Sequence, residues 1–337
     1  MLIDKFKRPL QDIRISVTDR CNFRCPYCMP SEIFGERYQF LPKEEILSFE
    51  EITRLTKILV GFGVNKIRIT GGEPLLRTDL HKLIKQISEL DDSLDITLTT
   101  NGFLLKDSAK LLKDSGLKRI TVSLDSMEDD VFRKMNGRNF GIDRVLEGID
   151  AATEAKLSPI KINAVVQKGV NDHTLIDLAK HFKGTGHIVR FIEYMDVGNK
   201  NGWELDEVVP ANDILAIIDK ELPLEPINPN YRGEVARRYR YKDGQGEIGI
   251  IASVSQPFCG DCSRARLSTD GSLYTCLFAS RGLDLRDTMR SGGTDTQLEE
   301  MIKNIWQART DKYSEERSDS VITNSSAPKI EMYQIGG

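Results

Sequence analysis

Short runs in which apolar and polar residues alternate recur six times in the first 196 residues of the chain. They cover residues 12–19, 66–74, 95–102, 119–126, 160–169 and 187–196. Between them lie segments with apolar residues at three- and four-residue spacing, the spacing of amphipathic helices. A regular alternation of strand and helix predicts a mainly parallel sheet, either open or curled into a barrel.

The helices between these strands have recognisable ends. The first is expected to begin at Ser48, because Glu51 follows three residues later and completes a capping box, and to end near Gly61 and Gly63. Further helices are expected over residues 78–90, 104–115, 142–156 and 174–182. Each would place its apolar side against the sheet.

The predicted strands have one apolar face and one polar, often basic, face. Parallel strands covered on both faces normally read as continuous apolar runs. Because side chains alternate along a strand, the polar faces carry Arg14 and Ser16, Lys66, Arg68 and Thr70, Thr97 and Thr99, and Lys161 and Asn163. If the apolar faces pack on outer helices, the polar faces line the lumen of a six-stranded partial barrel. Unpaired buried cations are costly, so such a lumen needs an anion. An open sheet with one solvated face is the alternative.

The last strand of this series is less regular. Arg190 and Met195 have opposite parity, so both can face the lumen only across a bulge or at the end of the strand.

The sequence pattern changes after about Glu221, where the alternation of strands and helices ends. Pro223, Pro226 and Pro229 interrupt helices, and residues 235–241 and 247–255 read as a hairpin around Asp243-Gly244. We therefore expect two regions, residues 1–221 and residues 222–337.

Length and charge set broad limits. The chain has 337 residues, a mass of 38.1 kDa and a formal net charge of -4, which gives no case for nucleic acid or an anionic membrane as a partner. The first residues contain no apolar secretion segment, and no later run is long enough to span a membrane. A cytoplasmic protein is expected, in which cysteines serve metal or redox chemistry rather than disulfides.

The six cysteines form two groups of three. They are Cys21, Cys25 and Cys28, and then Cys259, Cys262 and Cys276. Three thiolates from a short loop can bind three corners of a four-iron cluster and leave one iron open to an exogenous ligand. A zinc site, or a ferredoxin-type site with a distant fourth ligand, is the alternative for the first group. For the second group zinc would need a carboxylate or a distant ligand, because no histidine follows His187.

The first group carries a resemblance to a known superfamily. Cys-x3-Cys-x2-Cys, with Tyr27 just before the third cysteine, resembles the signature loop of radical S-adenosylmethionine (SAM) enzymes. Gly71-Gly72-Glu73-Pro74, about fifty residues later, resembles the segment that binds the methionyl amino group of SAM in that superfamily. The resemblance implies that the open iron binds SAM and that the reduced cluster cleaves it to a 5'-deoxyadenosyl radical.

Features near the end of the chain resemble one particular family within this superfamily. The second group has the spacing Cys-x2-Cys-x13-Cys, Arg264-Ala265-Arg266 lies between its last two cysteines, and the chain ends in Gly336-Gly337. Together these features resemble the radical SAM family that cyclises GTP in the first step of molybdenum cofactor biosynthesis. The resemblance covers nearly the whole chain. It implies an incomplete (β/α)6 TIM-like barrel with a C-terminal extension that carries a second [4Fe-4S] cluster.

This resemblance also implies a role for individual residues. The three cysteines of each group would bind one [4Fe-4S] cluster. SAM would contact Tyr27, Gly72, Ser123 and Met195. GTP would contact Arg14, Arg68, Thr99, Lys161, Arg264, Ala265 and Arg266, with Lys66 and Arg190 as further candidates for the triphosphate. The Gly336-Gly337 tail would reach into the active site.

The implied reaction is a lyase-type cyclisation. The deoxyadenosyl radical removes hydrogen from C3' of the ribose, and the carbon radical attacks C8 of guanine while the second cluster holds the base. The product is (8S)-3',8-cyclo-7,8-dihydroguanosine 5'-triphosphate. The implied partners are an external electron donor and a downstream cyclic pyranopterin monophosphate synthase. The oligomeric state is left open, with a homodimer as one option.

Two other functions compete with this interpretation. One is a peptide-modifying radical SAM enzyme with auxiliary clusters, although such extensions usually carry more than three cysteines. The other is a non-catalytic zinc or electron-transfer protein.

Overall fold

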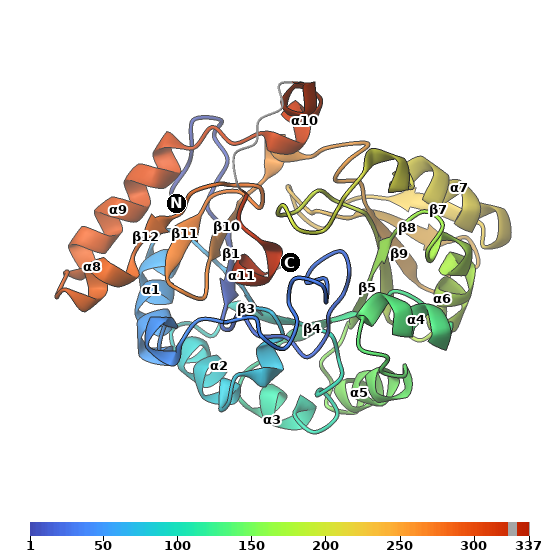
Figure 1. Cartoon of the computed structure of the whole chain (residues 1–337), viewed down its shortest axis with the longest axis horizontal. Helices are drawn as coiled ribbons and strands as arrows, with labels where there is room; N and C mark the ends of the chain where they lie inside the picture. Colours follow the sequence, from blue (N-terminus) through green and yellow to red (C-terminus); the bar gives the residue numbers. More distant parts are fainter. Residues whose placement is uncertain (323–328, 337) are drawn as a thin grey trace.

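The computed structural model describes residues 1–322 and 329–336. Its first six strands are parallel neighbours in chain order: β1 Asp12–Ser16, β2 Lys66–Thr70, β3 Asp95–Thr100, β4 Arg119–Ser123, β5 Lys161–Val166 and β6 Ile188–Glu193. They curve into an incomplete barrel with helices on the outside (Figure 1). The predicted barrel is thus confirmed, and each strand is shorter than the run that predicted it.

The outer helices follow from the amphipathic segments. They are α1 Phe49–Gly61, α2 Leu80–Ser88, α3 Ala109–Asp114, α4 Asp129–Asn136, α5 Asp143–Glu154 and α6 Leu175–Phe182. The capping box at Ser48 forms as predicted, with Oγ accepting from the amide of Glu51 at 3.1 Å and the Glu51 carboxylate accepting from the amide of Ser48 at 2.7 Å. Helix α4 was not predicted, because its two apolar anchors, Phe132 and Met135, are too few to make a clear pattern.

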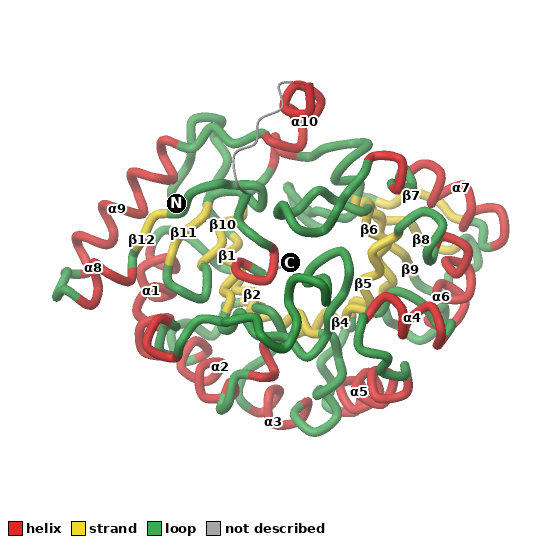
Figure 2. The backbone as a smooth tube through the Cα atoms, in the orientation of Figure 1, coloured by secondary structure: helices red, strands yellow, loops and turns green. Residues whose placement is uncertain are grey.

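The chain after residue 222 continues the same sheet at both edges (Figure 2). Its strands are β7 Leu224–Ile227, β8 Arg237–Tyr241, β9 Glu247–Ile251, β10 Arg264–Leu267, β11 Ser272–Tyr274 and β12 Leu283–Asp284. Strand β9 runs parallel beside β6, and β10 runs parallel beside β1. The β8–β9 hairpin is antiparallel, as predicted. The division at residues 221 and 222 stays a prediction.

Five more α-helices lie in the described part of the chain: α7 Ala211–Glu221, α8 Arg286–Arg290, α9 Asp295–Ala308, α10 Tyr313–Ile322 and α11 Met332–Ile335. Helix α9 lies outside the sheet beside β11 and β12, whereas α11 lies near the middle of the curved sheet (Figure 1). No helix among residues 1–322 and 329–336 is long and apolar enough to cross a membrane.

The hydrophobic core lies between the sheet and the outer helices. Ile13, Ile15, Ile67 and Ile69, on the apolar faces of β1 and β2, are fully buried. Strand parity therefore directs the opposite, polar faces toward the inside of the barrel.

A buried ionic network ties the N-terminus to the second cysteine group. The Asp4 carboxylate accepts from Nε of Arg8 at 2.6 Å and lies 3.7 Å from Nη1 of Arg309. Arg8 in turn donates to the carbonyl of Cys259 at 2.8 Å, and Arg309 donates to the carbonyl of Cys262 at 2.8 Å. One carboxylate thus fixes two guanidiniums that hold the cysteine loop.

Replacing Asp4 with Asn should destabilise the protein strongly. The change leaves the buried Arg8 without its counter-charge, and breaking a buried ion pair costs about 3–5 kcal/mol. Asp295→Asn is the matched control, because the Asp295–Arg54 pair is exposed and is worth about 1 kcal/mol or less. The free energy of unfolding in urea checks this. Equal losses in the two variants would contradict it.

Candidate functional site

The first cysteine group lies in a firmly held loop at the carboxyl end of β1. The amides of Cys28 and Met29 both donate to the carbonyl of Cys25, at 2.9 and 2.8 Å. Arg24 donates to the carbonyl of Cys21 at 2.7 Å, and its own amide donates to the carbonyl of Asn136. Hydrogen bonds to backbone carbonyls thus fix most of the loop, and the Cys21 sulfur also accepts from the amide of Phe23 at 3.4 Å.

The donor chemistry of this loop fits a cationic metal cluster. Burial, followed by the charge of Glu73, raises the pKa of Cys21 to about 12. Burial also raises the pKa of Cys25 and Cys28 above the usual range. Thiols in such surroundings become thiolates only beside a strong positive charge, which an iron cluster supplies. In residues 1–322 and 329–336, no group of three or more His, Cys, Asp or Glu side chains is placed to hold a single metal ion.

The Gly71–Pro74 segment packs directly under this loop. The amide of Gly72 donates to the carbonyl of Thr18 at 2.6 Å, and a side chain at Gly72 would overlap the carbonyl oxygen of Arg20. The buried Glu73 accepts from the Thr100 hydroxyl and the amide of Asn101, each at 2.7 Å. Burial raises the pKa of Glu73 to about 7. Only glycine allows this close approach of the two segments.

A carboxylate that sequence reasoning missed orients Tyr27. The Tyr27 hydroxyl donates to Oδ2 of Asp125 at 2.8 Å, and Oδ1 accepts from the amide of Val165 at 2.9 Å. Burial raises the pKa of Asp125 to about 6. The only sequence signal was its place two residues beyond Ser123, which is half-buried at the end of β4. Asp125 thereby links the cysteine loop to the end of β5.

The polar faces of the strands form rows of charge inside the barrel. Register pairs Arg14 of β1 with Arg68 of β2 on one side and with Arg266 of β10 on the other. One row nearer the amino ends, Asp12 lies between Lys66 and Arg264. The predicted basic residues are therefore neighbours in space, although they are up to about 250 residues apart in sequence.

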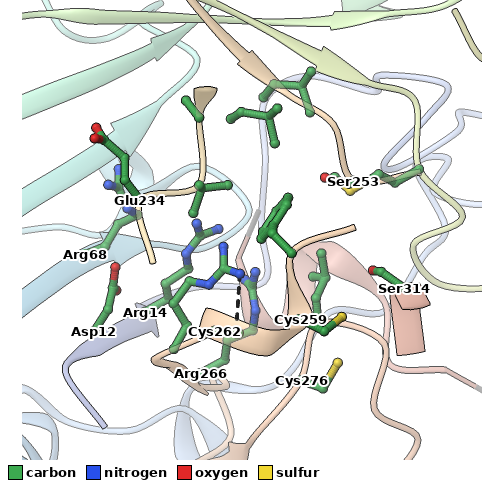
Figure 3. Close-up of a pocket in the computed structure, with 18 of the residues that line it drawn as sticks. Asp12, Arg14, Arg68, Glu234, Ser253, Cys259, Cys262, Arg266, Cys276 and Ser314 are labelled. Carbon is green, nitrogen blue, oxygen red and sulfur yellow. Dashed lines mark hydrogen bonds between the residues drawn. The ribbon is translucent and has the colours of Figure 1, made fainter. Parts of the chain in front are cut away.

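A single cavity brings these cations together with the second cysteine group (Figure 3). It encloses about 1290 Å³ of empty space, including its mouth. Of the predicted site residues, those that line it are Arg14, Lys66, Arg68, Thr99, Lys161, Arg190, Met195, Cys259, Cys262, Arg264, Arg266 and Cys276. Met195 lies beyond the end of β6, and so both it and Arg190 reach the cavity.

The remaining predicted residues lie outside the lining of this cavity. They are Cys21, Cys25, Tyr27, Cys28, Gly72, Ser123, Ala265 and Gly336. Ala265 is fully buried on the opposite face of β10, where strand parity puts it. The others cluster at the carboxyl ends of β1, β2 and β4, next to the first cysteine group.

The cations in the cavity lack sufficient counter-charge. Burial, and then the charges of Arg266 and Arg68, lower the pKa of Arg14 well below its ordinary value. Nε of Arg14 and Nε of Arg68 are buried without a hydrogen-bond partner among the described residues. Burial and neighbouring cations, Arg190 first, lower the pKa of Lys161 to about 7. The cavity is therefore built to receive a polyanion.

The second cysteine group differs from the first in its electrostatics. Burial alone would raise the pKa of Cys262, but Arg264 and Arg309 outweigh it and lower the pKa to about 6. Both guanidiniums donate to the Cys262 sulfur at 3.3 Å. Burial raises the pKa of Cys276 to about 11. A Cys262 sulfur with thiolate character, beside the half-buried Cys259 and Cys276, is a suitable donor set for an iron cluster.

The C-terminal tail contacts the wall of this cavity, which Met332 of α11 helps to line. Arg266 donates to the carbonyl of Gly336, and the amide of Thr269 donates to the carbonyl of Gln334 at 3.2 Å. A side chain at Gly336 would overlap the hydroxyl of Thr70. Gly337 lies outside the described residues.

Asp196 anchors the segment that precedes the tail. Its carboxylate accepts from the Tyr313 hydroxyl at 2.5 Å, from Arg317 at 3.0 Å and from Lys329 at 2.8 Å. It follows Met195 directly, so α10 and the start of the tail are tied to the rim of the cavity. Sequence reasoning missed this residue, because an isolated aspartate carries no pattern.

The chain is similar to known proteins over nearly its whole length. Residues 15–182 match the radical SAM superfamily, and residues 187–315 match the family described as Molybdenum Cofactor Synthesis C. The chain is 51% identical to a GTP 3',8-cyclase of Staphylococcus epidermidis over 335 residues, which is 99% of this chain and 98% of the relative. It is 52% identical to a GTP 3',8-cyclase of Acidothermus cellulolyticus over 339 residues, 99% and 94% of the two chains.

Solved structures support the fold. The crystal structure of Streptococcus suis SuiB bound to S-adenosylmethionine superposes with a TM-score of 0.60 at 15% identity, covering 87% of this chain and 68% of that one. SuiB bound to its precursor peptide SuiA superposes with a TM-score of 0.59. At this identity the likeness extends to the architecture alone.

The binding of an anion in the cavity should weaken as pH rises. An anion raises the lowered pKa of Lys161, so binding takes up a proton, and affinity falls as pH increases above about 7. Calorimetric titration with inorganic triphosphate between about pH 7 and pH 9 measures this slope. In Lys161→Arg the guanidinium stays charged over this range, and the slope should flatten. The same slope in both proteins would contradict the assignment to Lys161.

Proposed function

Because the chain belongs to the GTP 3',8-cyclase family of radical SAM enzymes, we propose that the basic cavity is its GTP site. The protein is an enzyme of molybdenum cofactor biosynthesis that joins C3' of the ribose to C8 of guanine, and it uses SAM and iron–sulfur clusters. One observation carries the proposal for the site. The unpaired cations and the second cysteine group line the same cavity.

The first cysteine group would hold the cluster that binds SAM. Cys21, Cys25 and Cys28 are the ligands, and Gly72 and Tyr27 lie beside them. When bound there, SAM supplies the 5'-deoxyadenosyl radical that removes the C3' hydrogen. The chain's contribution is position: the loop is fixed by backbone hydrogen bonds, and Asp125 fixes Tyr27.

The second group would hold a cluster against the guanine. Cys259, Cys262 and Cys276 are the ligands, and Arg264 and Arg266 lie on the strand between the last two. A guanidinium presents a planar fork of donors that matches planar and phosphate groups. Strand parity supports this role for Arg264 and Arg266, because both guanidiniums face the cavity while Ala265 faces away.

The triphosphate would lie over the cations of β1, β2, β5 and β6. Arg14 and Arg68 have an unused Nε each, and Lys161 has no ion pair among the described residues. A triphosphate supplies the missing negative charge and accepts these hydrogen bonds. Its binding would thus orient the ribose toward the SAM side of the barrel.

The wider setting is also part of the proposal. The reaction needs an external electron donor, and its product would pass to a cyclic pyranopterin monophosphate synthase in the cytoplasm. A homodimer is compatible with this function. Neither nucleic acid nor a membrane is among the proposed partners.

Anaerobic incubation with reductant, SAM and GTP tests the assignment. We expect 5'-deoxyadenosine and a 3',8-cyclised guanosine nucleotide to form together, with about eight irons per chain for two four-iron clusters. Cys25→Ser should abolish SAM cleavage. Cys276→Ser should keep the first cluster and lose GTP turnover. Formation of 5'-deoxyadenosine without a cyclised nucleotide would refute the function, and loss of both clusters in each variant would refute the two-site arrangement.

Arg266→Ala should weaken GTP far more than SAM. The Arg266 guanidinium lies beside Arg14 and lines the cavity. Loss of a charge-assisted hydrogen bond typically lowers the affinity for a ligand by about 10-fold or more. Equilibrium binding of each ligand to the cluster-loaded protein measures the difference. Unchanged GTP affinity would exclude the role.

The tail should matter for turnover rather than for cluster loading. Gly336→Ala would push the tail away from Thr70 and disturb the contact with Arg266, so turnover should fall sharply while both clusters stay loaded. Gly292→Ala is a matched control, because Gly292 also has a positive φ but lies in a turn with open space around it. Full turnover in Gly336→Ala and in a chain lacking both terminal glycines would refute a role for the tail.

A further inference from the structure

A second cavity lies at the amino ends of β4, β5, β6 and β9. Arg119, Lys161, Ile188 and Glu247 are the first residues of those four strands, and all of them line it. It shares Lys161, Arg190, Glu234 and Ala236 with the basic cavity described above. The two cavities are therefore adjacent across these side chains.

The basic side chains at the junction, where the two cavities meet, differ in whether they have an ion-pair partner. Arg119 and Arg238, on the wall of the second cavity, are paired with Asp95 and Glu247. Lys161 and Arg190 form no ion pair among the described residues; Arg190 donates instead to the amide oxygen of Asn163 at 2.9 Å. Two basic side chains without an ion pair thus lie where the cavities meet, and both line each cavity.

Among the described residues, Glu234 is the one carboxylate that lines both cavities, and it is hydrogen-bonded to Asn230. Glu234 accepts from the amide of Asn230 at 2.6 Å and from its side-chain nitrogen at 3.2 Å. It influences Arg190 through charge alone, by raising its pKa against the larger effect of burial. Asn230, which is exposed, lines the second cavity and not the first. Asn230 and Glu234 therefore form a polar rim between the junction and solvent.

The direction of the strands tells which end of a nucleotide would face this rim. Gly72 and Ser123 lie at the carboxyl ends of β2 and β4, next to the first cysteine group, whereas Lys66 and Lys161 begin β2 and β5. Strands of this length separate the two ends by about 15 Å. If the ribose meets SAM at the carboxyl ends, as the proposed function requires, the phosphate chain points to the amino ends.

We propose that the second cavity is a subsite for groups attached beyond the γ-phosphate. This inference rests on the proposed GTP site and extends it. The terminal phosphate lies at Lys161 and Arg190, and a longer 5' chain continues past Glu234 toward solvent. The ligand class is guanine nucleotides extended at the 5' end, such as guanosine 5'-tetraphosphate or GTP alkylated on the γ-phosphate. Discrimination would then act on the base and the ribose rather than on the length of the phosphate chain.

Competition binding to the cluster-loaded protein under anaerobic conditions tests this. Guanosine 5'-tetraphosphate and γ-(6-aminohexyl)-GTP should each bind within about threefold of GTP, since neither extension has to displace a packed wall. Tight GTP binding together with rejection of both analogues by about 100-fold would overturn the inference and leave the proposed function standing. Failure to bind GTP would overturn both.

A substitution at the rim gives the second arm of the test. Asn230→Trp should narrow the cavity and shift the ratio of affinities for γ-(6-aminohexyl)-GTP and GTP by about tenfold or more in favour of GTP. Asn228→Trp is the matched control, because Asn228 is exposed on the same segment but lines neither cavity, and it should leave the ratio unchanged. Equal ratios in wild type and Asn230→Trp would place the extension elsewhere and overturn the inference.

Discussion

The structure depends on positive charge held inside a barrel without enough negative charge beside it. Arg14 is flanked in register by Arg68 and Arg266, and the nearest row contributes Lys66 and Arg264. Burying such cations is unfavourable, so the rest of the fold must be stable without them. The apolar faces of the same strands provide that stability by packing on the outer helices. The lumen is thereby free to keep a positive charge that Asp12 offsets only in part.

The same constraint explains how the two halves of the chain are joined. A six-stranded partial barrel leaves two edges, and strands from beyond residue 222 pair with both. One of them, β10, carries Arg264 and Arg266 into the charged rows and brings the second cysteine group to the same cavity. The Asp4 network then fixes that cysteine loop from behind. Sheet pairing therefore brings the charged rows and the second cysteine group to the same cavity.

Local patterns predicted several of these features correctly. Alternation identified the strands and the cavity-facing residues of β1, β2 and β5, and the Ser48 capping box placed the start of α1. Other features carried no local signal. Asp4, Asp125 and Asp196 act through partners far away in the sequence, and α4 has too short an apolar pattern. A lone aspartate gains meaning only from the groups that surround it after folding.

The sequence by itself determined the chemistry of the parts. It specified two groups of three thiols, strands with one basic face and a tail of two glycines, because spacing and periodicity are local properties. The tertiary structure decided how the parts meet. Parallel register set Arg14 beside Arg266, and the pairing of β10 with β1 put the second cysteine group at the basic cavity. The tail then meets this wall through the contact between Arg266 and the carbonyl of Gly336. Such contacts join residues hundreds of positions apart, and their geometry depends on the register and shear of the whole sheet, which no short segment encodes.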